Sequence, residues 1–117
     1  EKGRVHAVCG TMLELGSGAA EYHRAVGRRA AELGFYALIA FGDLGEHILE
    51  GAQELTPDQK TPGLKTLHTH DPDEAAQYLL EHAEAGDMIL FKGSRSARTE
   101  RVLDALRKKL EISGGRT

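Results

Sequence analysis

The run Lys92-Gly93-Ser94-Arg95 places two cations and a hydroxyl where a short apolar segment gives way to a helix-forming one. Backbone N–H groups and the helix dipole attract anions at such a junction. Arg95 can hold a carboxylate or phosphate through two hydrogen bonds, and Lys92 can act as a point charge. Ser94 lacks the G-x-S-x-G context of a hydrolase nucleophile. The loop is a candidate anion site; the alternative is a serine cap with solvated basic neighbours.

A second candidate loop runs from Gly10 to Gly18 and also contains Gly16. Its glycine spacing does not match the dinucleotide motif G-x-G-x-x-G, and no Gly-Lys-Ser/Thr follows to make a phosphate loop. Glu14 is the only acid in this loop. It is a candidate site residue, with a solvated loop carboxylate as the alternative.

The histidines raise the question of a metal site. His68 and His70 form an H-x-H pair, but no third ligand follows at a suitable spacing, so a structural or surface role is favoured. His23 recurs with the apolar face of its helix, which indicates a half-buried, hydrogen-bonded side chain. Cys9 ends an apolar run and is expected to be a small buried hydrophobe. No metal is expected from these residues.

Four short apolar segments predict the strands that carry these loops: residues 5–9, 35–41, 64–68 and 87–92. The run at 35–41 is continuously apolar, which predicts a strand buried on both faces. The run at 87–92 is also expected to be a short buried strand.

Four segments predict helices: residues 18–33, 44–55, 71–85 and 96–110. Gly34 is expected to close the first helix, and Asp43 to cap the second. Asp71 should cap the third, with Pro72 at its first position. The last should bury its apolar side chains, which are Val102, Leu103, Leu106 and Leu110.

Strands and helices alternate about every 30 residues, which is typical of βαβ units. We therefore expect an α/β, Rossmann-like domain with a mostly parallel sheet, helices on both faces and right-handed crossovers. Ligands of such sheets bind beyond the carboxyl ends of the strands. The loops at 10–18, 42–43 and 92–95 should meet there.

Composition bounds the class of protein. The 117 residues fit one domain, and 40% hydrophobic with 28% charged residues argues for a globular core. The formal charge of −3 argues against general binding to nucleic acid or anionic membrane. No apolar stretch or leader suggests membrane insertion or secretion, and the single cysteine fits a reducing compartment. A protein of a reducing compartment, without nucleic-acid or membrane partners, is expected.

Several motifs together resemble the C-terminal domain of the Mur ligases over roughly residues 4–110. They are Thr11-Met12-Leu13-Glu14-Leu15-Gly16, His23 with Val26-Gly27, Ile39-Ala40-Phe41-Gly42, the run from Gly86 to Arg95, and Glu100-Arg101-Val102. The resemblance is greatest to the branch that adds D-alanyl-D-alanine to a UDP-N-acetylmuramoyl tripeptide in peptidoglycan synthesis.

The resemblance implies a cytoplasmic, ATP-dependent peptide ligase of three domains. The first holds the UDP-sugar peptide, and the central one holds ATP and Mg²⁺. The C-terminal domain closes over the centre and helps to bind the dipeptide, whose amine attacks an acyl phosphate. The resemblance places Lys92, Ser94 and Arg95 on one cleft-facing loop and Glu14 and Gly16 on another, as substrate-binding residues. No catalytic residue and no bound cofactor are expected in this chain.

Two departures from the family pattern qualify this hypothesis. Thr11 stands where the family usually has Asp, and the Asn-Pro segment, the helix after it and the ATP domain are not in this sequence. The chain is expected to be inactive alone. It is interpreted as the lid of a longer enzyme that contacts its own central domain. The alternatives are a stand-alone module that binds a small anion or another protein, and a general nucleotide-binding Rossmann protein.

Overall fold

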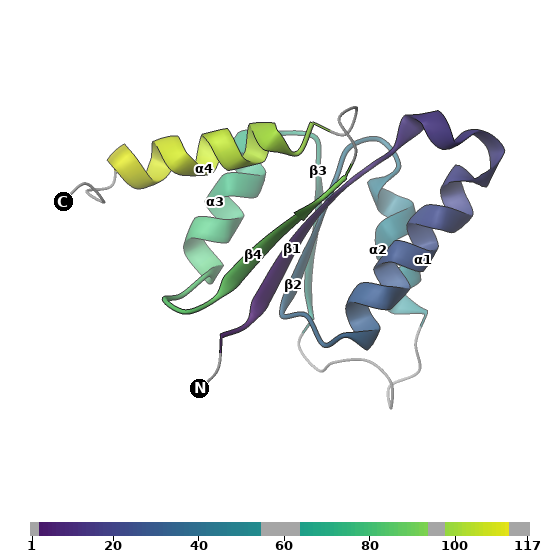
Figure 1. Ribbon diagram of the computed structural model, residues 1–117, viewed down its shortest axis with the longest axis horizontal. Coiled ribbons are helices and arrows are strands. Elements are labelled where there is room, and N and C mark those ends of the chain that lie inside the picture. Colours follow the sequence, from purple (N-terminus) through teal and green to yellow (C-terminus); the bar gives the residue numbers. More distant parts are fainter. Residues whose placement is uncertain (1–2, 55–63, 94–97, 113–117) are drawn as a thin grey trace.

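Four parallel strands form a single sheet in the order β3-β2-β1-β4 (Figure 1). The structure is a computed structural model that describes residues 3–54, 64–93 and 98–112. The strands are β1 (Val5–Gly10), β2 (Ala37–Phe41), β3 (Lys65–Thr69) and β4 (Met88–Lys92). All four therefore end at the same edge, as the sequence predicted for an α/β domain.

Helices cover both faces of this sheet (Figure 1). A 3₁₀ segment, η1 (Leu13–Gly18), leads into α1 (Ala19–Glu32), which packs with α2 (Gly45–Gln53) on one face. The other face carries α3 (Pro72–His82) and α4 (Glu100–Ile112). The predicted Rossmann-like class is confirmed.

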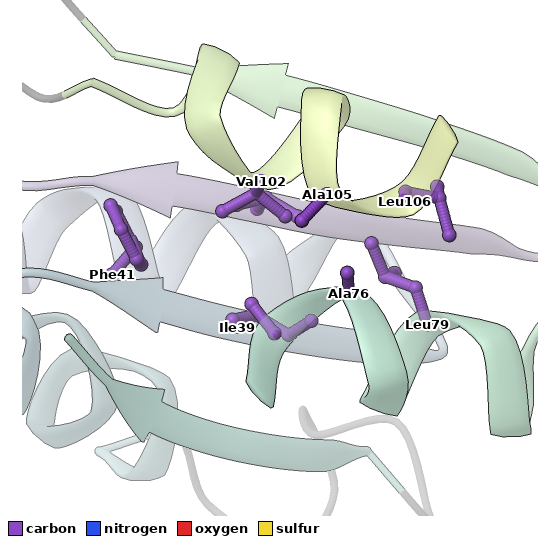
Figure 2. Close-up of a cluster of buried hydrophobic side chains, with 9 residues drawn as sticks. Ile39, Phe41, Ala76, Leu79, Val102, Ala105 and Leu106 are labelled. Atoms are coloured by element: carbon purple, nitrogen blue, oxygen red, sulfur yellow. The ribbon is translucent and has the colours of Figure 1, made fainter. Parts of the chain in front are cut away.

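Alternating side chains of the central strands fill two separate cores. Ala7 and Leu38 face α1 and α2, whereas Val8 and Ile39 face α3 and α4. Figure 2 shows the second core, where the side chains of β2 meet those of α3 and α4. Every residue of β2 is buried, which confirms the strand predicted from the apolar run at 35–41.

Strand β4 differs from its prediction. Ile89 and Phe91 pack against the α3–α4 core, but Met88 and Leu90 are 61% and 40% exposed. The reason is position: β4 lies at the edge of the sheet, and α1 and α2 pack over its neighbours. The prediction of a buried strand is therefore wrong for this face of β4, because only the face that carries Ile89 and Phe91 packs against a core.

Only some of the helix ends predicted from the sequence agree with the structure. Asp71 accepts a hydrogen bond from the backbone N–H of Asp73, and Pro72 opens α3, as predicted. Asp43 does not cap α2; residue 44 occupies the cap position without a side-chain hydrogen bond. Gly34 follows α1 with a φ of 77°, a conformation that favours glycine.

Two further helix ends differ from their predictions. The third helix ends at His82 instead of residue 85, and α4 begins at Glu100 instead of residue 96. Leu110 is 45% exposed instead of buried, whereas Val102 and Leu106 are buried as expected.

Two glycines let α1 and α2 approach backbone to backbone. A Cβ atom at Gly27 would lie 1.7 Å from the carbonyl oxygen of Ile48, and one at Gly51 would lie 1.8 Å from that of Arg24. Neither carbonyl can rotate away as a side chain could. The two helices can therefore pack this closely only with glycine at both positions.

Gly27→Ala should destabilise the chain by about 3 kcal/mol, because the added methyl group must push the two helices apart. The measurement is the free energy of unfolding in urea. Gly18→Ala is the control, since a Cβ there meets nothing within 4 Å; Gly18 is the N-cap of α1, so this change should cost about 1 kcal/mol or less. Equal stability of the two variants would contradict the close approach.

Asp87 joins the chain before β1 to the turn before β4. Its buried carboxylate, 5% exposed, accepts hydrogen bonds from the backbone N–H groups of Arg4 and Glu84 and from the Arg4 guanidinium. The Nε2–H of fully buried His6 donates to it at 2.8 Å. These donors, the backbone N–H of Arg4 first, hold the pKa of Asp87 well below its ordinary value.

Because the pKa of Asp87 is lower in the folded chain, the free energy of unfolding depends on pH. Folded Asp87 binds a proton less readily than unfolded Asp87, so its contribution is complete above about pH 5 and is lost as the pH falls below about 4. Asp87→Asn should lower the free energy of unfolding at neutral pH. It should also make that free energy fall less as the pH drops, which urea unfolding across that pH range measures. Asp104→Asn, on the exposed side of α4, should keep the wild-type acid profile; an unchanged profile in Asp87→Asn would refute the assignment.

Candidate functional site

Backbone hydrogen bonds tie together the ends of three neighbouring strands. The N–H of Thr11, just after β1, donates to the carbonyl of Phe41 at the end of β2, at 3.0 Å. The N–H of Gly42 donates in turn to the carbonyl of Thr69 at the end of β3, also at 3.0 Å. The loops that follow β1 and β2 therefore start from fixed positions on the carboxyl edge of the sheet.

Thr11 and Gly42 are in close contact within this edge. Thr11 is 4% exposed, and a Cβ atom at Gly42 would lie 2.4 Å from its Oγ1. Gly42 also has a φ of 112°, which disfavours any other residue. Thr11 is thus packed against the loop that follows β2.

His23 fixes the start of the loop after β1. Its Nε2 accepts the backbone N–H of Met12 at 2.9 Å, and its Nδ1–H donates to the carbonyl of Ala19. Because both ring nitrogens are used in this way, the ring is neutral with its proton on Nδ1. The predicted hydrogen-bonded role is confirmed, and at 1% exposure the side chain is more buried than expected.

Lys92 lies at the carboxyl end of β4, opposite Cys9 of β1 in the sheet register. Both residues line a hollow of about 290 Å³ between α1 and β4, together with apolar side chains that include Val26, Phe35 and Leu90. Lys92 is exposed, and no ion pair joins it to any other residue in the described ranges. Lys92 is therefore an exposed basic side chain at the carboxyl end of β4.

Cys9 contributes a buried wall to the hollow. It is 4% exposed, and burial raises the pKa of its thiol to about 11, although the charge of nearby Lys92 acts in the opposite direction. A thiol with that pKa stays protonated at neutral pH. The prediction of a small buried hydrophobe is confirmed.

The other predicted site residues are placed only in part. Gly16 sits in η1 with a φ of 65°, in the left-handed region, and is exposed. Glu14 belongs to the same 3₁₀ segment, but its side chain lies outside the described part. Ser94 and Arg95 also lie outside the described residues. The structure therefore brings Lys92 and the backbone of the Gly16 segment to the carboxyl edge and leaves the rest of the set as a prediction.

The H-x-H pair, for which the sequence favoured a structural or surface role, contacts the loop between β2 and α2. His68 Nε2 lies 2.8 Å from the carbonyl oxygen of Gly42, and His70 Nε2 lies 3.0 Å from the carboxylate of Asp43. Among the residues described, no cluster of three His, Cys, Asp or Glu side chains could hold a metal ion. The partner residues 42 and 43 lie 26 and 27 positions from the histidines, so no local pattern reveals these contacts.

A parallel α/β sheet whose loops gather at the carboxyl edge defines a Rossmann-like domain. In the described ranges no helix is long and apolar enough to cross a membrane. The sequence model of the family described as "Mur ligase, glutamate ligase domain" matches residues 1–95. The chain belongs to this Mur ligase family.

The relatives agree with this assignment. Over 104 residues, 89% of the chain, it is 32% identical to the UDP-N-acetylmuramoyl-tripeptide–D-alanyl-D-alanine ligase of Bacillus subtilis (strain 168). Solved structures with the same fold include the MurF ligase of Thermotoga maritima in complex with ADP (TM-score 0.73, 31% identity, 96% of this chain). Another is MurF of Acinetobacter baumannii (TM-score 0.72, 28% identity, 92% of this chain). The chain spans only 22% of the first of these proteins and 23% of each of the other two.

Replacing His23 tests whether it supports the loop after β1. His23→Phe keeps a ring in the buried site, but it leaves the N–H of Met12 without its acceptor and removes the second donor to the carbonyl of Ala19. Stability should fall by about 1–3 kcal/mol, measured by urea unfolding. His47→Phe on α2 removes only a surface contact with Glu50 and should change stability by less than about 0.5 kcal/mol. Similar losses in both variants would argue against the special role of His23.

Proposed function

We propose that this chain is a single domain, the C-terminal lid of an ATP-dependent ligase that adds D-alanyl-D-alanine to a UDP-N-acetylmuramoyl tripeptide in peptidoglycan synthesis. The observation that carries the proposal is the similarity over 89% of the chain to a ligase with that name. The family resemblance of the loops that start at Thr11, Gly42 and Lys92 supports it, because these loops follow strands that end at one edge. The cytoplasm is the expected compartment.

In this proposal the domain binds and positions the incoming dipeptide. Lys92 supplies a positive charge to its carboxylate, and Ser94 and Arg95 complete that contact. Glu14 and Gly16 face the same cleft from the segment after β1. Closing such a lid orients the reactants and excludes water, which can lower a reaction barrier substantially.

ATP and Mg²⁺ belong to the central domain in this proposal, and so does the phosphate chemistry. The sequence contains no Gly-Lys-Ser/Thr phosphate loop. The described residues gather no set of side chains that could hold a metal ion. The 117-residue chain by itself should therefore bind neither and should be inactive.

The complete protein that contains this chain tests the proposal directly. With ATP, Mg²⁺, the UDP-sugar tripeptide and D-alanyl-D-alanine it should release phosphate and form the pentapeptide product, detected by mass spectrometry. The coding sequence upstream should include a Gly-Lys-Thr/Ser phosphate loop. Absence of that loop, or phosphate release without the peptide product, would refute the ligase. Calorimetric binding of a small anion to the 117-residue chain would favour a stand-alone module instead.

Lys92→Ala in the complete protein should raise KM for D-alanyl-D-alanine by about tenfold to a hundredfold, because a charge-assisted hydrogen bond is lost. Arg95→Ala should act in the same direction. Steady-state kinetics with the dipeptide varied provide the measurement, and Lys108→Ala on the exposed side of α4 serves as the control. Wild-type kinetics in both loop variants would remove the dipeptide-binding role from this loop.

A further inference from the structure

The end of β3 holds Gly42 by both of its backbone polar groups. The carbonyl of Thr69 accepts the Gly42 N–H at 3.0 Å, and the ring of His68 approaches the Gly42 carbonyl oxygen at 2.8 Å. A carbonyl oxygen can only accept, so His68 donates here from a protonated Nε2. Gly42 is thus fixed from β3 on two sides, directly after β2 ends.

His68 reaches this position only because α2 begins with a glycine. A Cβ atom at Gly45 would lie 2.5 Å from Cδ2 of His68, and 3.1 Å from the Cβ of Ala40. Ala40 is the register partner of His68, so the ring lies over the sheet beneath the first turn of α2. The small side chain at position 40 and the absent one at position 45 together leave room for the imidazole.

The hydrogen bond between His68 and Gly42 also affects the residue that follows β1, because that residue packs against Gly42. Thr11 packs against Gly42 so closely that a Cβ at position 42 would lie 2.4 Å from its Oγ1. A shift of Gly42 must therefore move Thr11 or open a gap beside it. Met12 follows Thr11 and is held by His23, so the start of the loop that contains Gly16 depends on the same set of contacts.

His70 also contacts the loop between β2 and α2, but more weakly than His68 does. It binds the carboxylate of Asp43 at 3.0 Å, but the two side chains are 61% and 71% exposed. Exposed pairs of this kind contribute little to stability or to geometry. The half-buried His68 is therefore the member of the H-x-H pair that can set the position of the loop.

We propose that His68 is a positioning residue of the ligase site: it holds Gly42, and through Gly42 the start of the Thr11 loop, in the place needed for substrate binding. This role rests on the proposed function, because it matters to ligation only if the carboxyl edge faces the substrates. The hydrogen bond from Nε2 to the Gly42 carbonyl is the feature that carries it.

The test compares three variants of the complete protein. His68→Leu removes the donor while filling the space. His68→Gln keeps an N–H donor at nearly the same reach. His70→Ala removes only the exposed neighbour. Two measurements apply to each: steady-state kinetics with D-alanyl-D-alanine, and hydrogen–deuterium exchange of the peptides that contain Thr11 and Gly42.

His68→Leu should lower kcat/KM about tenfold and speed exchange at both peptides, since the Gly42 carbonyl then keeps only its longer hydrogen bond, at 3.2 Å, from the N–H of Gly45. His68→Gln should recover to within about threefold of wild type, and His70→Ala should stay within about twofold. Wild-type exchange in His68→Leu, or equal impairment in His68→Leu and His68→Gln, would overturn the positioning role. If the wild-type protein proves not to be a ligase, the proposed function fails, and the exchange data still decide whether His68 fixes the loop.

Discussion

The parallel pairing of β1 with a strand on each side sets the geometry of the whole domain. His6 lies opposite Ala37 of β2 and opposite Ile89 of β4, so the three strands run in register and end together. Backbone hydrogen bonds then continue past the strand ends into the loops, from Thr11 to Phe41 and from Gly42 to Thr69. The site is in this sense an extension of the sheet, and its precision depends on the pairing of the strands.

Local sequence was sufficient where one element determines the structure. The apolar run at 35–41 correctly predicted a strand buried on both faces, because only a central strand can bury all its side chains. Asp71 and Pro72 correctly predicted the start of α3, since cap and ring act within one turn. The position of His23 on the apolar face of its helix predicted a hydrogen-bonded ring. That position did not reveal its partner, the backbone N–H of Met12.

The failures came from contacts between distant parts of the chain. Asp43 is a residue type that often caps helices, but its carboxylate binds His70, which follows the end of β3. The apolar run of β4 says nothing about its place at the edge of the sheet, which leaves Leu90 exposed. The contact of His68 with Gly42 joins residues 26 positions apart and needs the glycine at 45 as well. No periodicity within one element carries that information.

The position of β4 has a practical consequence for work on the domain in isolation. Within the described ranges no strand pairs with its outer edge, and the exposed side chains of Met88 and Leu90 project beside that edge. An open strand edge with apolar neighbours is a template for pairing with another copy of the same strand. Protein concentration is therefore an experimental variable for the isolated domain. A charged residue introduced at Met88 is the direct means of keeping such a preparation monomeric.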